Sequence, residues 1–199
     1  MHTPNTFRAA DGGASNANNI GGAESFAATG DPADRLIAQL RLQPTGIGGY
    51  VAPGPGGAAT LLRATLPERF DGDRPIYSSN YFLLKAGTVL QLHGLNQDEQ
   101  WFFHQGSAIR LHAFADTGLY TSCDIGADLE QGQSFHGVAR GQQWFGAELL
   151  GPGYALVSCS LAPAWDKRDS SRPSAAQISA LQAQFPAQAA IIARLGSPS

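Results

Sequence analysis

The 199-residue chain is poor in charge and contains no long apolar run. Charged residues make up 15% of it and the formal net charge is -3, so we expect no surface for nucleic acid. The sequence has no stretch of about 18 apolar residues, and we therefore expect no membrane-spanning helix. The first residues lack the apolar segment of a secretory signal. These features together predict a cytoplasmic protein.

Cysteine is also scarce, and the common catalytic signatures are missing. Cys123 and Cys159 are the two cysteines, and they lie outside any CxxC spacing. Isolated cysteines are typical of buried free thiols, although a disulfide between these two stays an alternative. The sequence has no P-loop, GxSxG, GxGxxG or zinc-finger pattern. The protein classes that depend on these motifs are therefore excluded.

Glycine and proline, by contrast, are frequent, with 24 and 12 residues. They separate short apolar runs that have strand character, and most separators carry glycine suited to positive φ. Many short strands with regular turns predict an all-β jelly roll or closed barrel. The runs are residues 49–51, 59–64, 76–85, 88–93, 100–104, 108–115, 119–123, 133–138, 144–149 and 154–161.

The two ends of the chain have a different character. Residues 1–30 are rich in Gly, Ala, Asn and Ser without periodicity, which predicts a disordered tail before a single domain at 31–199. Asp31 and Pro32 are typical of a helix start, and an apolar stripe follows them. Near the other end, Ser174 is a helix cap and Pro186 interrupts the helical pattern. We therefore expect one short N-terminal helix and two C-terminal helices outside the barrel.

Residues 87–106 hold the strongest candidate for chemistry. Strand alternation predicts that Gln91 and His93 share one face, and that Glu99, Trp101 and Phe103 share one face of the return strand. Hairpin pairing of the two strands would bring His93 and Glu99 side by side. A histidine and a carboxylate that converge inside a barrel form a candidate acid–base or metal-binding pair.

The same residues carry a family resemblance. The pattern Gly87-x5-His93-x-Leu95-x3-Glu99-x6-Gly106 resembles the first cupin motif, with Leu95 in place of a second histidine. A weaker match to the second motif is Gly132, then Ala139-x-Gly141-x2-Trp144-x3-Glu148. From Asp34 onward the chain resembles the fifth cupin subfamily, of unknown function. Its matching pieces include Tyr81-Phe82-Leu83-Leu84, Asp98-Glu99-x-Trp101 and Cys159-x3-Pro163-x-Trp165-Asp166. The resemblance implies a double-stranded β-helix, the cupin jelly-roll barrel.

The resemblance also bears on metal binding. A typical cupin centre uses three histidines and one glutamate, but this chain has only His93 and Glu99 at the matching positions. Leu95 and Trp144 cannot bind a metal, and two protein ligands would hold a divalent ion weakly. We therefore expect no cofactor, although an atypical divalent metal at His93 and Glu99 stays an alternative.

Six further residues are predicted to contact the substrate. Indole side chains in such a pocket can stack on a planar or sugar-like ligand. The six are Gln91, Asp98, Trp101, Trp144, Tyr81 and Phe103.

Three functions follow from this pattern. The first is a metal-independent isomerase, epimerase or lyase acting on a small sugar-like or hydroxy-acid-like molecule, with His93 as general base and Glu99 setting its pKa and orientation. The second is a metal-dependent dioxygenase or isomerase. The third is a non-catalytic module that binds a small metabolite. By analogy with other small barrels we also expect a homodimer, with the strand near Gly49 as a candidate for exchange between subunits.

Overall fold

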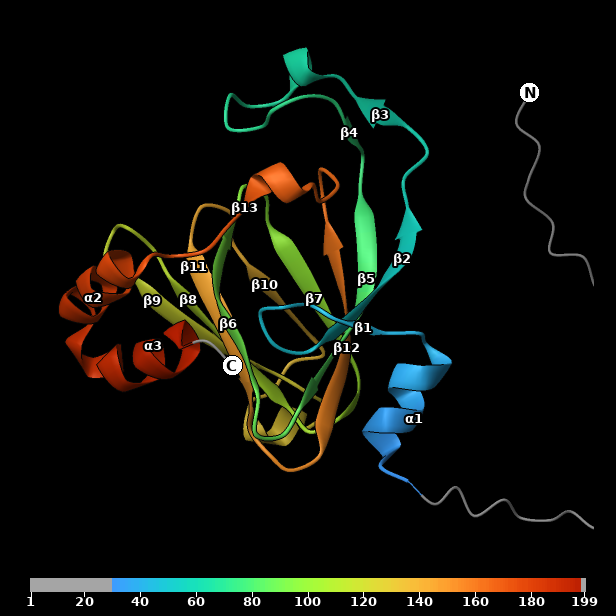
Figure 1. Cartoon of the computed structure of the whole chain (residues 1–199), viewed down its shortest axis with the longest axis vertical. Helices are drawn as coiled ribbons and strands as arrows, with labels where there is room; N and C mark the ends of the chain where they lie inside the picture. Colours follow the sequence, from blue (N-terminus) through green and yellow to red (C-terminus); the bar gives the residue numbers. More distant parts are fainter. Residues whose placement is uncertain (1–29, 198–199) are drawn as a thin grey trace, which may run out of the picture.

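The computed structural model describes residues 30–197, which form two facing β-sheets with helices outside them (Figure 1). The predicted disordered tail falls outside the described residues, except for Gly30. One sheet has six strands in the order β1 (Gln43–Pro44), β2 (Tyr50–Gly56), β5 (Ser78–Lys85), β12 (Tyr154–Leu161), β7 (Glu99–Gly106) and β10 (His136–Ala139). The other has five, in the order β13 (Ser170–Ser171), β6 (Val89–Leu95), β11 (Trp144–Leu149), β8 (Ile109–Phe114) and β9 (Tyr120–Ile125).

This architecture confirms the predicted all-β jelly roll. The expected strands at 144–149 and 154–161 have the observed bounds, and most others differ by one to three residues at an end. A small ribbon of β3 (Thr60–Leu61) and β4 (Arg74–Pro75) projects beyond one end of the sheets (Figure 1). The strand β2 pairs with β5 of its own chain, and the homodimer stays a prediction.

Three helices lie on the outer faces of the sheets, as expected. In α1 (Pro32–Gln39) the Asp31 side chain accepts a hydrogen bond from the Ala33 amide at 3.0 Å, and this helix packs on the larger sheet. The helices α2 (Ala175–Gln184) and α3 (Ala189–Gly196) cover the smaller sheet, separated by a 3-10 turn at Pro186–Gln188. Ser174 and Gln177 form a capping box at the start of α2. Within residues 30–197 no helix is long and apolar enough to span a bilayer.

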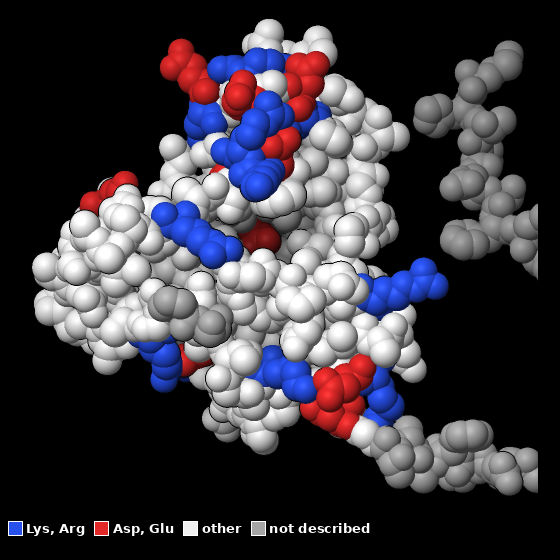
Figure 2. All heavy atoms as spheres, viewed as in Figure 1, with Lys and Arg blue, Asp and Glu red and all other residues white. Residues whose placement is uncertain are grey.

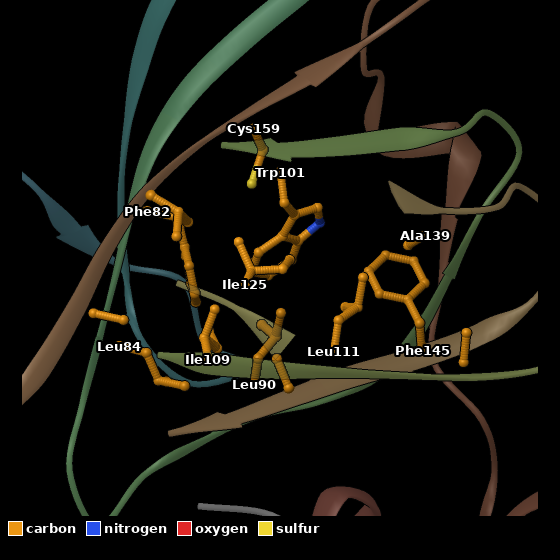
Figure 3. Packing of buried hydrophobic residues seen from close by; sticks show 14 of the residues in the cluster. Phe82, Leu84, Leu90, Trp101, Ile109, Leu111, Ile125, Ala139, Phe145 and Cys159 are labelled. Atoms are coloured by element: carbon orange, nitrogen blue, oxygen red, sulfur yellow. The ribbon is translucent and has the colours of Figure 1, made fainter. Parts of the chain in front are cut away.

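The main core lies between the two sheets (Figure 3). Trp101 from the larger sheet packs edge-on against Phe82, with 5.6 Å between the ring centroids. Ile109 and Phe145 of the smaller sheet belong to the same cluster. Burial of such large side chains is the main stabilising contribution to a two-sheet sandwich. Cys123 and Cys159 are free thiols, as predicted.

A β-bulge in β6 changes which residues face the core. His93 lies opposite Phe145 and Leu90 opposite Ala147, so two residues of β6 face Gly146 alone. A Cβ at Gly146 would lie 2.7 Å from the Leu90 carbonyl oxygen, which explains the glycine there. The extra residue lets Leu90 and His93 both face the interior, whereas simple alternation would place them on opposite faces.

Candidate functional site

A cavity of about 630 Å³ opens at one end of the space between the sheets. Small-molecule sites are typically roughly 300–1,000 Å³, with mostly apolar walls and a few polar groups. The hollow is visible in Figure 2, where acidic atoms lie deep inside it and basic atoms lie near its rim. Its lining includes Phe82, Glu99, Trp101, Cys159 and Leu161 from the larger sheet, Leu90, His93 and Leu95 from the smaller sheet, and residues of the 165–172 segment at the rim.

His93 is buried in this lining, with 6% of its surface exposed. Its Nδ1 atom lies 2.8 Å from the Gln91 carbonyl oxygen. A carbonyl can only accept, so Nδ1 carries the hydrogen and the lone pair of the neutral ring is on Nε2. Burial lowers the pKa of His93 to about 4, with the nearby positive charge of Arg172 acting in the same direction. The ring is therefore an uncharged base at neutral pH.

Glu99 lies on the facing sheet and is 8% exposed. Burial raises the pKa of its carboxyl group to about 7, against the lowering effect of a hydrogen bond from Trp101. That bond runs from Trp101 Nε1 to Glu99 Oε2 over 3.0 Å. Because Oε2 accepts, Oε1 is the oxygen that carries the proton in the acid form. Near neutral pH the group is thus divided between acid and carboxylate.

The structure brings His93 and Glu99 to one cavity, but by a different route from the predicted hairpin. Their strands, β6 and β7, belong to different sheets and do not pair with each other. Among the described residues no hydrogen bond joins the two side chains, and the Gln91 carbonyl orients the His93 ring. The expectation that Glu99 orients His93 is therefore wrong. The two groups line the cavity from opposite walls.

Of the six predicted substrate contacts, only Trp101 lines the cavity. Asp98 lies in the turn after β6 and accepts hydrogen bonds from Arg140 Nη1 at 2.6 Å and from the Gly141 amide at 2.8 Å. These bonds hold the turn against the segment before β11. Asp98 is therefore a structural residue, away from the cavity.

The other four predicted contacts lie outside the lining. Trp144 packs with the cluster beneath the C-terminal helices. Tyr81 is 37% exposed and packs against His104 on the outer face of the larger sheet, with 5.8 Å between the ring centroids. Phe103 packs against the core cluster, and Gln91 belongs to the bulge. Alternation alone could not place them, because the bulge and the separation of β6 and β7 into two sheets are tertiary features.

Several lining residues were not identified from the sequence. Asn80 Oδ1 is buried and has no hydrogen-bond partner among the described residues. A buried acceptor without a partner among these residues costs about 1–3 kcal/mol. Trp165, Lys167 and Arg172 line the rim. In the sequence Trp165 appears within a family motif, but no spacing marks the two cations.

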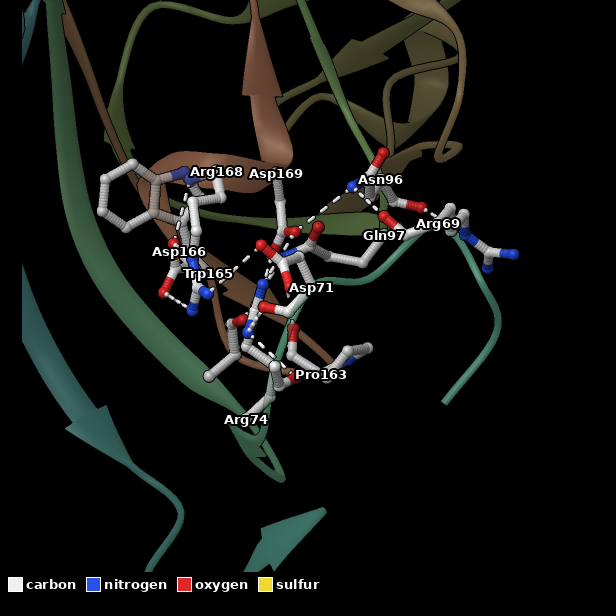
Figure 4. Close-up of polar contacts among 12 residues, drawn as sticks. Arg69, Asp71, Arg74, Asn96, Gln97, Pro163, Trp165, Asp166, Arg168 and Asp169 are labelled. Carbon is white, nitrogen blue, oxygen red and sulfur yellow. Dashed lines mark hydrogen bonds and ion pairs between the residues drawn. The ribbon is translucent and has the colours of Figure 1, made fainter. Parts of the chain in front are cut away.

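A buried ion pair fixes the rim segment (Figure 4). The Arg74 guanidinium donates to Asp169 Oδ2 at 3.1 Å and Oδ1 at 3.0 Å, and both side chains are 1% exposed. Asn96 Nδ2, in the turn after β6, also donates to Asp169 Oδ1 at 3.2 Å. Paired and hydrogen-bonded buried charges hold their neighbours in one arrangement. Residues 165–172 are therefore tied both to the β3–β4 ribbon and to the turn that precedes Glu99.

The donor set does not fit the metal centre that the cupin fold implies. Within residues 30–197 no group of three or more His, Cys, Asp or Glu side chains is arranged to hold an ion. Leu95 lines the cavity with an apolar side chain, and Trp144 is outside it. Stable transition-metal sites in proteins usually need three or four such donors.

Comparisons with known proteins agree with this fold. The model of the Cupin superfamily (DUF985) matches residues 34–172. A hypothetical protein from Leishmania major is 28% identical with a TM-score of 0.71, covering 82% of this chain and 97% of its own. A protein of known X-ray structure from Shewanella oneidensis is 29% identical with a TM-score of 0.71, covering 84% of this chain and 98% of its own. No curated protein gives a significant match. This chain therefore belongs to the cupin superfamily, in the DUF985 family, whose function is unknown.

Proposed function

We propose that this cupin is a metal-independent isomerase, epimerase or lyase for a small sugar-like or hydroxy-acid-like molecule, with His93 as general base and Glu99 as general acid. One observation carries the proposal: two buried ionisable groups line one cavity from opposite walls, in complementary protonation states. Pairs of titratable groups whose pKa values are moved apart by their surroundings are typical of acid–base sites.

The chemistry follows from His93 Nε2 and Glu99 Oε1, which have no hydrogen-bond partner in the described part of the chain. His93 Nε2 takes the proton from a carbon next to a carbonyl group, while Glu99 Oε1–H gives its proton to the carbonyl oxygen. The product of this step is an enol, with His93 protonated and Glu99 ionised. Protonated His93 then gives up its proton while the Glu99 carboxylate takes a hydroxyl proton from the enol. Delivery of the His93 proton to the neighbouring carbon gives an isomer, delivery to the other face of the same carbon after the enol has turned in the cavity gives an epimer, and delivery to a leaving group as it departs gives the lyase outcome. Such positioned groups typically accelerate proton transfer about 10²–10⁴-fold.

The cavity suits a small substrate that has both polar groups and apolar carbon surface. Ser78, Ser79, Ser170 and Ser171 add hydroxyl groups to the lining, and the Asn80 amide adds a further polar group. Phe82 and Trp101 form part of its apolar wall. Apolar walls with a few placed polar groups bind and orient small ligands.

The pH dependence of kcat/KM tests the assignment of base and acid. The productive form has neutral His93, whose pKa is about 4, and protonated Glu99, whose pKa is about 7. We therefore expect a plateau between these values, with a loss of activity on either side. The rate of this step is measured by NMR in deuterated water, as the loss of the signal of the carbon-bound hydrogen next to the carbonyl group in candidate keto-sugars and hydroxy acids. Activity that rises through about pH 7 would instead make the Glu99 carboxylate the base.

A second candidate is a non-catalytic metabolite-binding cupin. It is favoured by the low pKa of His93, about 4, because so weak a base removes a carbon-bound proton slowly. Tight ligand binding without hydrogen exchange, in wild type and His93→Asn alike, would support this candidate. Elemental analysis of untagged protein complements both tests, since a full equivalent of metal lost in His93→Ala and Glu99→Ala would contradict metal independence.

A further inference from the structure

Two positive charges stand at the mouth of the cavity. Lys167, in the 3-10 turn Lys167–Asp169, and Arg172 both belong to its lining and are exposed to solvent. Among the described residues that line the cavity, Glu99 is the single acid, and it is buried at the floor. In Figure 2 basic atoms lie near the rim of the hollow with acidic atoms beside them, and further acidic atoms lie deep inside it. The charged side chains that line the mouth of the cavity are therefore both positive.

Neither charge is neutralised within the described part of the chain. Arg172 Nη2 donates to the Gly46 carbonyl oxygen at 3.1 Å, and within residues 30–197 no carboxylate forms an ion pair with Arg172 or Lys167. The neighbouring Arg168, in contrast, donates to Asp166 through Nε and Nη2, each at 2.9 Å. The Gly46 carbonyl thus helps to position the Arg172 guanidinium without cancelling its charge.

A residue at the mouth of the cavity influences a residue at its floor. The positive charge of Arg172 contributes, after burial, to the lowered pKa of His93. The Arg74–Asp169 ion pair and Asn96 also fix the backbone between Lys167 and Arg172. Two cations held at the entrance of a small-molecule cavity focus anions into it.

We infer that the ligand of this cavity carries a phosphate or carboxylate group, whose oxygens bind Arg172 and Lys167 at the mouth while its uncharged part reaches His93 and Glu99. Guanidinium matches such planar or multi-oxygen anions with two parallel hydrogen bonds, and an ammonium group adds a point charge. The inference names the substrate class of the proposed enzyme and rests on that function for the reaction at the floor, whereas binding at the mouth is measured separately.

Calorimetric titration with glucose, glucose 6-phosphate and glucuronate tests this, because the three probes share a hexose ring and differ in charge. We expect at least one anionic probe to bind about tenfold or more tightly than glucose, with the gain reduced at high ionic strength. The phosphate and carboxylate arms distinguish the two sources of charge. Inorganic phosphate alone, followed by the width of its phosphorus NMR signal, gives a measurement that does not depend on the sugar.

Three variants locate the effect. Arg172→Gln and Lys167→Gln should each remove most of the gain, since each removes one cation from the mouth. Arg168→Gln is the matched control: it makes the same charge change in the same segment, but its side chain is outside the lining and should leave the gain intact. Circular dichroism of each variant checks the fold.

The outcomes separate the inference from the proposed function. Equal affinity for charged and neutral probes together with unbroadened phosphate, or an anion preference that survives in Arg172→Gln and Lys167→Gln, would overturn the inference. Anion binding without any hydrogen exchange would support the inference and count against the acid–base function. Hydrogen exchange on neutral substrates alone would support the acid–base function and count against the inference.

Discussion

Two buried histidines lie on opposite faces of the smaller sheet. His93 in β6 faces the cavity, whereas His112 in β8 lies on the outer face, close to the C-terminal helices. They are 6% and 4% exposed, and burial is the largest cause that lowers the pKa of each to about 4. By burial and pKa alone the two residues cannot be told apart.

Their hydrogen bonds differ. His112 Nε2 lies 3.2 Å from Glu148 Oε1, a group that can only accept when ionised, and Nδ1 lies 2.8 Å from the Tyr120 hydroxyl group. Glu148 also bonds to Arg194 of α3, so the network joins the sheet to the helix. Both ring nitrogens of His112 are thus engaged, while Nε2 of His93, beside the cavity, has no hydrogen-bond partner within residues 30–197. A displaced pKa reports burial here, and the free nitrogen in a cavity indicates chemistry.

Replacing each histidine by asparagine should separate the two roles most strongly. In His93→Asn the side-chain amide can keep the bond to the Gln91 carbonyl but removes Nε2, so we expect hydrogen exchange to fall about 10²–10⁴-fold. His112→Asn should retain the wild-type rate within about twofold, because no bond of His112 reaches the cavity. NMR exchange rates on one substrate compare the variants. Equal losses in both variants would mean that His93 acts through stability alone.

The pH dependence of stability gives the next largest effect. Both histidines have folded pKa values of about 4 against a reference of 6.5, so their stabilising contribution is present above pH 6.5 and is lost as pH falls toward 4. Glu99 has the opposite slope: its pKa of about 7 against 4.5 means that its contribution is present below pH 4.5 and is lost as pH rises through 7. Each shift corresponds to about 3 kcal/mol.

Urea unfolding of wild type and Glu99→Gln over this pH range measures the slope. The free energy of unfolding of wild type, relative to Glu99→Gln, should decrease by about 3 kcal/mol between pH 4.5 and 7. Relative to His93→Asn or His112→Asn it should instead increase with pH over the range from about 4 to 6.5, by a similar amount for each. Parallel curves for wild type and Glu99→Gln would show that the carboxyl group is solvated in the folded protein.

The sequence predicts the elements of this fold well, because local rules set them. The short apolar runs between glycine-containing turns coincide with observed strands. The observed helices α1 and α2 begin at the predicted caps, Asp31 and Ser174. The sheet face on which each side chain lies was predicted less well. The bulge opposite Gly146 adds one residue to β6, so counting by twos from His93 assigns the wrong face to Leu90.

Of the residues that line the candidate cavity, the sequence pointed to His93 and Glu99 at the floor and to neither cation at the mouth. His93 and Glu99 were found because a motif of fixed spacing contains both. Asn80, Lys167 and Arg172 come from distant parts of the chain, and only the pairing of β5 with β12 and the Arg74–Asp169 ion pair bring them to the cavity. Trp144 was assigned to the pocket by analogy, but its position in β11 directs it to the helix-covered side. Such tertiary contacts leave no local signal in the sequence.

The smallest effect tests whether the His112 network is purely structural. Tyr120→Phe removes the hydroxyl group that lies 2.8 Å from His112 Nδ1, and the ring can keep its packing against Phe114, 5.2 Å away between centroids. Loss of one hydrogen bond at a part-buried site should lower the free energy of unfolding by about 1 kcal/mol. The exchange rate at the cavity should stay that of wild type. A slower rate in Tyr120→Phe, with unfolding unchanged, would show that the outer face of the sheet influences His93 and would remove the distinction between the two histidines.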